Sequence, residues 1–181
     1  MRNMILLGML ALGAAGCASS SERESVSDAP AAPPQATADV RDSGGMTKAR
    51  ANIVQVGTDL RVRIEASGMA RGAYGAHVHE TGRCDPPGFT TAGAHWNPSG
   101  RKHGKDNPAG MHKGDLPNLL VGTDGRGIFE ITIHDAVLSG QGGSVLLDGD
   151  GAAIVIHAAP DDFRTDPSGN SGARIACGVL G

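Results

Sequence analysis

The sequence predicts an all-β, antiparallel domain, either a sandwich or a barrel, and three observations support this fold class. Residues 60–66 and 129–134 alternate apolar and polar side chains with the period of two that is typical of a strand with one buried face. Glycine is abundant, at 28 of 181 residues, and aromatic residues make up only 3%, which suits short strands joined by tight turns. No long segment combines helical spacing with capping residues.

Length and charge narrow the class of protein further. With 181 residues, 39% of them apolar, the chain fits one domain plus some extra sequence. The formal net charge of -3 gives no basic signature for a nucleic-acid partner. Any electric field that attracts an anion must therefore be local.

Residues 1–16 are expected to be a signal peptide. Arg2 precedes the apolar run "MILLGMLALGAAGC", which is too short for a comfortable membrane span and ends in small residues. The ending "AAGC" resembles the bacterial lipoprotein signal, in which Cys17 would become the lipidated first residue. An ordinary signal peptide with a chance cysteine is the alternative. In both cases we expect export, and with lipidation a location anchored in the bacterial cell envelope, facing the periplasm or the outside.

Residues 17–36 are expected to form a flexible tether, and residues 37–181 the folded domain. The stretch "ASSSERESVSDAPAAPPQA" is rich in Ser, Ala, Pro and charge, with one valine as its only large apolar residue. Such a segment cannot bury enough surface to offset the entropy lost on ordering.

Within the domain, turn signals separate the predicted strands. "TDGRG" at 123–127 and "DGDG" at 148–151 are typical turn sequences. The opening strand, near 36–42, is only weakly marked. Beside the two alternating segments, further strands are predicted at 144–147 ("SVLL") and 152–157 ("AAIVIH").

Besides the predicted surface residue His134, three of the seven histidines lie on predicted strands, where the period of two places them. In "AHVH", His77 and His79 share one face and Val78 occupies the other. His157 likewise lies on the face opposite Ile154 and Ile156. If Val78 points into the core, both imidazoles of the pair point away from it, within reach of one metal ion. An accidental surface pair is the alternative for this motif alone.

A second group of histidines lies on a segment that has almost nothing apolar to bury. Residues 94–115, "AHWNPSGRKHGKDNPAGMHKGD", hold His95, His103, His112 and Asp115 among glycines and prolines. Three imidazoles and a carboxylate suit tetrahedral zinc, and imidazole-rich sites also suit copper. Closing the loop on a metal would supply stability that burial cannot. The alternative is a disordered polar loop with coincidental histidines.

Six motifs in order give the chain a resemblance to the copper–zinc superoxide dismutase family. They are "HVHE", "GAHWNP", "RKHG", "MHKGDLPN", "VIHAAPDD" and "GARIACGVLG", and the resemblance runs from about residue 37 to the C-terminus. It implies an eight-stranded antiparallel Greek-key β-barrel, of the immunoglobulin-like sandwich or barrel type. It also implies that two long loops form the metal site outside the barrel wall.

The resemblance assigns roles residue by residue. Asp161 resembles the carboxylate that hydrogen-bonds a ligand of each metal, and Arg174 the arginine beside the copper that receives the substrate. Asp162 is the less favoured choice for the carboxylate. The implied copper ligands are His77, His79, His95 and His157, and the implied zinc ligands are His95, His103, His112 and Asp115.

The three cysteines fit the same resemblance. It implies a disulfide between Cys84 and Cys177, and lipidation of Cys17 would account for the remaining thiol. An oxidising compartment permits the bond. Two buried free thiols are the alternative.

The activity implied is dismutation of superoxide to oxygen and hydrogen peroxide. A redox-cycling copper ion, bridged through His95 to a structural zinc ion, would perform it, with one ion of each metal per subunit, in antioxidant defence of the envelope. A metal carrier without turnover and a purely structural zinc domain are the competing functions. The sequence leaves a monomer and a homodimer both open.

Several other residues of these motifs are expected to have ordinary roles. The loop at 158–173 is short for the family, and Arg164 is interpreted as a solvated loop residue. His134 is expected on the surface and Trp96 in packing. Arg101 and Lys102 are also expected to be loop surface residues.

Overall fold

A computed structural model describes residues 31–181. The predicted signal peptide and Cys17 lie outside the described residues. The first strand begins at Gln35, and the backbone N–H of Gln55 already donates to the Pro34 carbonyl at 2.9 Å. Among residues 31–181, no helix is long and apolar enough to cross a membrane.

The described chain is all-β, which confirms the predicted fold class. Its one helical element is a short 3-10 helix, η1 (Thr90–Ala92). The strands, in chain order, are β1 (Gln35–Asp42), β2 (Thr47–Val56), β3 (Asp59–Ala66), β4 (Gly72–Tyr74), β5 (Ala76–His79), β6 (Leu119–Val121), β7 (Gly127–Ile133), β8 (Ala136–Val137), β9 (Ser144–Val145), β10 (Ala153–His157) and β11 (Arg174–Val179).

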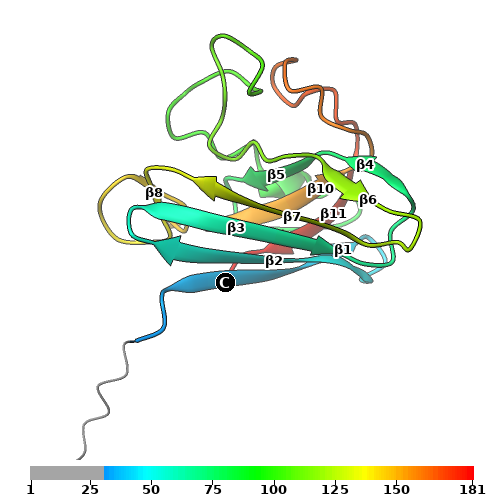
Figure 1. Ribbon diagram of the computed structural model, residues 1–181, viewed down its shortest axis with the longest axis horizontal. Helices are drawn as coiled ribbons and strands as arrows, with labels where there is room; N and C mark the ends of the chain where they lie inside the picture. The colour runs from blue at the N-terminus through cyan, green and yellow to red at the C-terminus, as the bar shows by residue number, and fades with distance from the viewer. Residues whose placement is uncertain (1–30) are drawn as a thin grey trace, which may run out of the picture. The chain divides into compact units, whose positions relative to one another are not determined.

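Counted with β4 and β5 as one strand, eight strands follow one another around a barrel. Seven strands form one antiparallel sheet in the order β5-β10-β11-β1-β2-β3-β7, and β4 pairs with β6. Only Gly75 separates β4 from β5, so these two form one interrupted strand, and β6 leads into β7 through the turn closed by the Gly122–Arg126 hydrogen bond. Figure 1 shows the curled sheet that results. The extra pair, β8 and β9, is a short parallel ribbon.

Gly75 interrupts that strand because the second long loop bonds to it. Its N–H donates to the Ala159 carbonyl at 2.8 Å, and its own carbonyl accepts from His157 N at 2.8 Å. A Cβ at this position would lie 2.8 Å from the Ser171 Cβ. Glycine therefore lets the loop 158–173 approach the barrel wall next to the histidines of β5.

Alternation fills the barrel as the sequence predicts. In β3, Leu60, Val62 and Ile64 are fully buried and pack in the main core, while the residues between them are exposed. The weakly marked opening strand is real: β1 alternates in the same way but buries Ala36, Ala38 and Val40, whose small side chains make its pattern faint.

The strand predicted at 144–147 is shorter than expected. Only Ser144 and Val145 belong to β9, and the prediction is wrong for Leu146 and Leu147. Leu146 is instead buried in the core, so the apolar run here reflects burial of an irregular segment. A short apolar run cannot separate these two cases.

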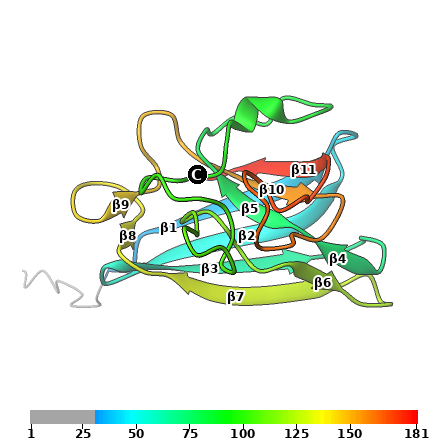
Figure 2. The same cartoon turned by 90° about the horizontal axis from the view of Figure 1, so that it is seen from above.

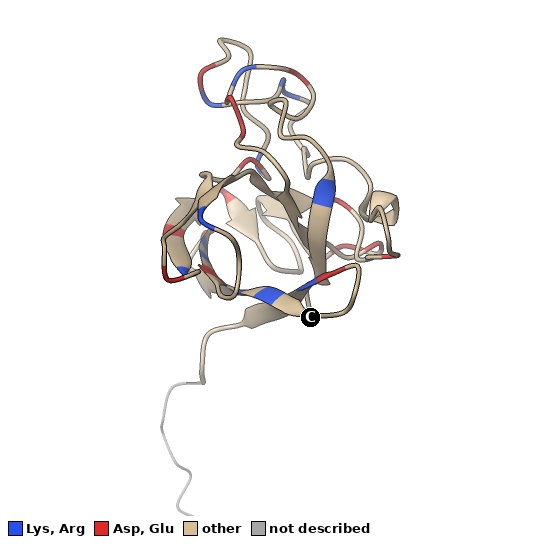
Figure 3. Cartoon of the chain, turned by 90° about the vertical axis from the view of Figure 1, so that its right-hand side faces the viewer, with Lys and Arg blue, Asp and Glu red and all other residues tan. Residues whose placement is uncertain are grey.

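Two long loops cover one side of the barrel. The first spans residues 80–118, between β5 and β6, and the second spans residues 158–173, between β10 and β11. Figures 1 and 2 show both of them over β5 and β10. In the view of Figure 3, basic and acidic residues are interspersed along the described chain.

Candidate metal centre

The strands place three histidines beside one another, as the period of two predicts. In the β5–β10 pairing, Val78 lies opposite Ile154 and His77 opposite Val155. Val78 and Ile154 point into the main core, so His77 and His79 point out of it. His157 ends β10 at a register shift. The loops cover all three rings, which are at most 3% exposed.

Four ring nitrogens on this side have no hydrogen-bond partner in the part of the chain that the structure describes. They are His77 Nδ1, His79 Nε2, His95 Nε2 and His157 Nε2, and all are buried. Burying a polar atom without a partner is costly. The ligand atoms of these residues lie within 4.8 Å of one another. Such convergence fits a metal ion bound by imidazole, and we call these residues the four-histidine group.

A second set of donors converges on one carboxylate oxygen. The Nδ1 atoms of His95, His103 and His112 lie 2.9, 3.0 and 3.1 Å from Asp115 Oδ1. Asp115 Oδ2 accepts the N–H groups of Gly104 at 2.9 Å and His112 at 3.0 Å, which fixes the carboxylate. Three imidazole nitrogens and one carboxylate oxygen match a four-coordinate zinc set. We call these four residues the Asp115 group.

His95 belongs to both groups. Its Nδ1 lies against Asp115, and its Nε2 is one of the four unpartnered nitrogens. Its ring stacks on that of His77, with the ring centroids 3.9 Å apart. The two faces of the centre therefore meet at one imidazole.

In His77, His79 and His157, the ring nitrogen that faces away from the centre of the four-histidine group is hydrogen-bonded. These bonds fix the direction of the nitrogen that faces the centre. His79 Nδ1 donates to the Gly93 carbonyl at 3.0 Å, and His157 Nδ1 donates to the Gly172 carbonyl at 3.1 Å. His77 Nε2 contacts Asp161 Oδ2 at 2.7 Å. A donated N–H on one ring nitrogen fixes the tautomer and leaves the other nitrogen as a ligand.

Asp161 links the two groups. Its Oδ1 lies 2.9 Å from His103 Nε2, while its Oδ2 contacts His77, so one carboxylate touches a residue of each group. Asp162, the alternative considered from the sequence, bonds within its own loop, to Thr165 and Asn170. The structure therefore places Asp161, and not Asp162, between the rings.

Burial keeps the four-histidine group neutral. It lowers the pKa of His77 to about 3 and that of His157 to about 4, and it lowers the pKa of His79 well below its ordinary value. A neutral imidazole is the form that binds a metal. These rings therefore need no deprotonation near neutral pH before they can act as ligands.

The Asp115 group has the opposite electrostatics. Although burial opposes it, the hydrogen bonds that His103 donates to Asp115 and Asp161 raise its pKa to about 9. Burial likewise opposes ionisation of Asp115 and Asp161, but hydrogen bonds from histidines hold the pKa of each carboxyl well below its usual range. Positive charge is therefore favoured here, as it would be for a bound cation.

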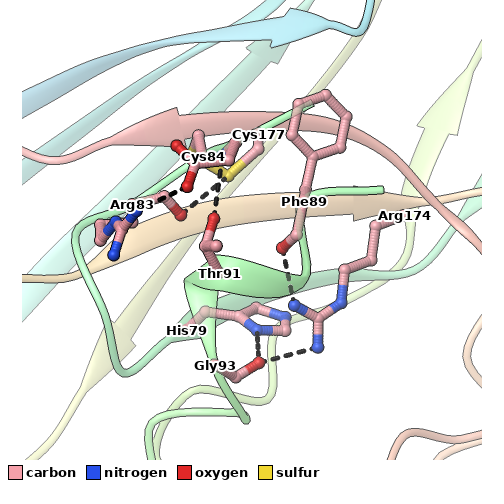
Figure 4. Close-up of a disulfide and its surroundings, with 9 residues drawn as sticks. His79, Arg83, Cys84, Phe89, Thr91, Gly93, Arg174 and Cys177 are labelled. Atoms are coloured by element: carbon pink, nitrogen blue, oxygen red, sulfur yellow. Dashed lines mark hydrogen bonds and ion pairs between the residues drawn. A yellow bond between two sulfur atoms is a disulfide. The ribbon is translucent and has the colours of Figure 1, made fainter. Parts of the chain in front are cut away.

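Arg174 lies beside the four-histidine group, at the start of β11. Its two terminal nitrogens donate to the carbonyls of Phe89 at 2.9 Å and Gly93 at 2.7 Å. The Gly93 carbonyl also accepts from His79 Nδ1, so one backbone oxygen holds both residues (Figure 4). The guanidinium is half-buried, which leaves it an accessible positive charge.

A disulfide joins Cys84 to Cys177, across 93 positions of sequence. It connects the first loop to β11, near the segment that holds Arg174 (Figure 4). The pairing implied by the family resemblance is thus present in the structure.

The structure gives the remaining residues of these motifs surface or packing positions. The His134 side chain is 76% exposed and bonds to Asp59. Trp96 packs in the core, and Arg101 and Arg164 are exposed. Lys102 is on the surface, but it pairs with Asp166 at 3.0 Å, whose carboxylate also accepts the His103 N–H at 2.8 Å. No sequence pattern marked Asp166.

The fold and the centre together define a class: an all-β barrel protein with two adjoining metal-ligand groups under two loops. The sequence profile of copper/zinc superoxide dismutase matches residues 47–180. The chain belongs to this family. The family and the enzyme class predicted from the sequence are thereby confirmed.

Relatives of known name cover most of the chain. Superoxide dismutase [Cu-Zn] 1 of Aquifex aeolicus is 40% identical over 147 residues, which are 79% of this chain and 85% of the relative. Superoxide dismutase [Cu-Zn] of Caulobacter vibrioides is 40% identical over 147 residues, 80% of this chain and 84% of the relative. The crystal structure of a SOD-like protein from Bacillus subtilis, 39% identical, superposes with a TM-score of 0.75 over 80% of this chain and 97% of that one.

Proposed function

We propose that this protein dismutates superoxide to oxygen and hydrogen peroxide with one copper and one zinc ion. Copper would be held by the four-histidine group and zinc by the Asp115 group, with His95 bridging the two. The single observation that supports this most strongly is the set of four unpartnered nitrogens next to a complete zinc-type donor set. Both donor sets fit their metals chemically.

The two metals supply different chemistry when bound: copper changes oxidation state by one electron, whereas zinc does not. Two superoxide anions and two protons give one oxygen molecule and one hydrogen peroxide molecule. The protein must therefore attract an anion, keep bulk water from the ligands, and deliver protons. Its own residues account for each of these tasks.

Arg174 would attract and position the anion. Arginine stays protonated at all relevant pH values, and the carbonyls of Phe89 and Gly93 hold this guanidinium in place. A fixed local charge can raise the encounter rate of a small anion even on a protein with net negative charge.

His95 would supply a proton. Its Nδ1 side is anchored at Asp115, so Nε2 is the atom that can hold a proton on the side of the four-histidine group. Burial lowers the pKa of His95, so a proton held there is readily given up to a basic product such as the peroxide dianion.

We further propose that the protein acts outside the cytoplasm, on the cell envelope, anchored by lipid on Cys17. The tether predicted at 17–36 would then end before β1, which begins at Gln35 and buries Ala36. The support for this location is the leader sequence and the disulfide, which an oxidising compartment preserves. A Cys17→Ser variant should move from the membrane fraction to the soluble exported fraction. If the protein stays in the membrane fraction, the lipid anchor is wrong.

The decisive test of the activity is the decay of a superoxide pulse. With the chain reconstituted with both metals, we expect a second-order rate of about 10⁸ to 10⁹ M⁻¹s⁻¹, near the diffusional ceiling. The acceleration should vanish when copper alone is omitted. A chain that binds both metals without acceleration would instead be a metal carrier.

A further inference from the structure

The carboxylate of Asp161 contacts two histidine rings at once, so its position must be fixed by the residues around it. The side chain is buried, and each oxygen contacts a ring nitrogen of a different group, on His77 and on His103. A carboxylate on a mobile loop would lose one of these contacts with a small rotation. Something must therefore fix the backbone of the second loop at this residue.

Asn118 provides that fixation. Its Oδ1 accepts the Asp161 N–H at 2.8 Å, and its Nδ2 donates to the Asp161 carbonyl at 2.9 Å. The two bonds are reciprocal, so one side-chain amide satisfies both backbone groups of Asp161. Asn118 lies directly before β6, so the contact ties the second loop to a barrel strand.

Gly169 closes the other side of the carboxylate. Its φ is +63°, and a Cβ there would lie 1.8 Å from Asp161 Oδ1 and 2.7 Å from His103 Nε2. Its carbonyl also accepts the Asp162 N–H at 2.9 Å. Because this neighbour leaves no spare room, a small movement of the Asp161 backbone would break the contact with His103.

We propose that Asn118 is a positioning residue for the whole metal centre: by holding the Asp161 backbone, it keeps His77 and His103 in the orientations that both groups need. The inference deepens the proposed function and rests on it for the identity of the two metals. It reaches no substrate directly. Its effect passes through Asp161 to one ring of each group.

The test compares Asn118→Ala with Asn107→Ala in the full chain. Asn107 also ties the two loops together, through Nδ2 to the Arg164 carbonyl at 3.3 Å, but it does not touch Asp161. We expect Asn118→Ala to weaken zinc binding by about 10- to 100-fold, the usual cost of losing a group that orients a ligand. Asn107→Ala should leave the affinity within about twofold.

Ring N–H signals in NMR give a readout that general damage would not reproduce. The Nε2–H signals of His77 and His103, which contact Asp161, should exchange faster with water in Asn118→Ala. The Nδ1–H signals of His79 and His157, which donate to backbone carbonyls, should be unchanged. An Asn118→Asp variant keeps the acceptor for the Asp161 N–H but loses the donor, so it should fall between Ala and wild type.

Unchanged zinc affinity and unchanged His77 and His103 signals in Asn118→Ala would overturn the proposal. So would the equal loss of all four ring signals, because that would make Asn118 a general structural residue. Failure of the proposed function is distinguishable: wild type would then lack turnover or copper binding. The ring signals can still be compared in the metal-free chain, since the contacts need no metal.

Discussion

The two sides of the His95 ring are built from the same kind of residue but are stabilised in different ways. In the four-histidine group, hydrogen bonds hold the outer edges of the rings, and the inner nitrogens have no partner among residues 31–181. In the Asp115 group, the inner nitrogens converge on a negatively charged carboxylate, which stabilises positive charge next to it. Under the proposed function, which nitrogen is left over, and whether an anion accompanies it, would distinguish the site for the redox-active metal from the site for the structural cation.

Removing one ligand from each side would break this comparison most strongly. His157→Ala should reduce superoxide turnover to the uncatalysed rate while zinc stays bound, because only the four-histidine group loses a donor. His112→Ala removes a donor from the Asp115 group only, so it should lose zinc before copper. Metal content by mass spectrometry, measured together with pulse decay, checks both.

The exposed His134→Ala is the matched control, and it should keep both metals and full turnover. Turnover that persists in His157→Ala would remove that residue from the copper ligands. Loss of both metals from either ligand variant would mean that the two groups are not separable.

Reducing the disulfide should have the next largest effect. In the chain-entropy model, a bridge over a loop of more than ninety residues contributes roughly 4 to 5 kcal/mol to the free energy of unfolding. We expect Cys84→Ser with Cys177→Ser to lose about that amount in urea unfolding. A loss below about 1 kcal/mol would contradict the entropic account.

Arg174 offers a further test of the difference between the two groups, because its charge lies beside the four-histidine group only. Arg174→Ala should lower the second-order rate by roughly tenfold and flatten its decrease with ionic strength. Zinc affinity should not change. An equally steep salt dependence in the variant would show that other charges guide the anion.

The smallest expected effect is a pH profile of the metal-free chain. Because burial holds the pKa of His77 near about 3 and that of His157 near about 4, the unfolded chain binds more protons below pH ~6.5. The free energy of unfolding should therefore fall as the pH drops from there. His103 acts in the other direction: its pKa of about 9 adds stability that is lost as the pH rises through about 9.

Urea midpoints between pH 5 and 9 would measure this profile. We expect a maximum near pH 6.5. Bound zinc and copper should remove the alkaline limb, because a metal-bound His103 no longer carries the extra proton, and should steepen the acid limb, because only the unfolded chain then binds protons at these histidines. A flat profile in the metal-free chain would contradict the directions of these shifts.

Local periodicity predicted the barrel strands and the histidines that they carry. The alternation in β3 and the H-x-H pair of β5 need only the period of two, which is a property of the chain itself. β1 was harder to recognise, since Ala36 and Ala38 give little contrast with their neighbours.

The division of the loop ligands between copper and zinc could be assigned only from family resemblance. The composition of residues 94–115 indicated a metal-ligand set, but His95, His103 and His112 lie on a segment without a period, so nothing local shows that their Nδ1 atoms meet. Neither the periodicity nor the resemblance gave a role to Asn118, which ends the motif "MHKGDLPN", or to Gly169. A reciprocal bond between a side-chain amide and a distant backbone, or a glycine needed for one close contact, leaves no repeat in the sequence.

The shared carbonyl of Gly93 has a consequence for how such a protein can change over generations. The same oxygen accepts hydrogen bonds from His79 and Arg174. Under the proposed function, a mutation that shifts this turn would therefore change metal binding by His79 and superoxide binding by Arg174 together. A lineage selected only for keeping its metal would still inherit a well-placed guanidinium. Selection on the position of His79 would therefore also act on the position of Arg174.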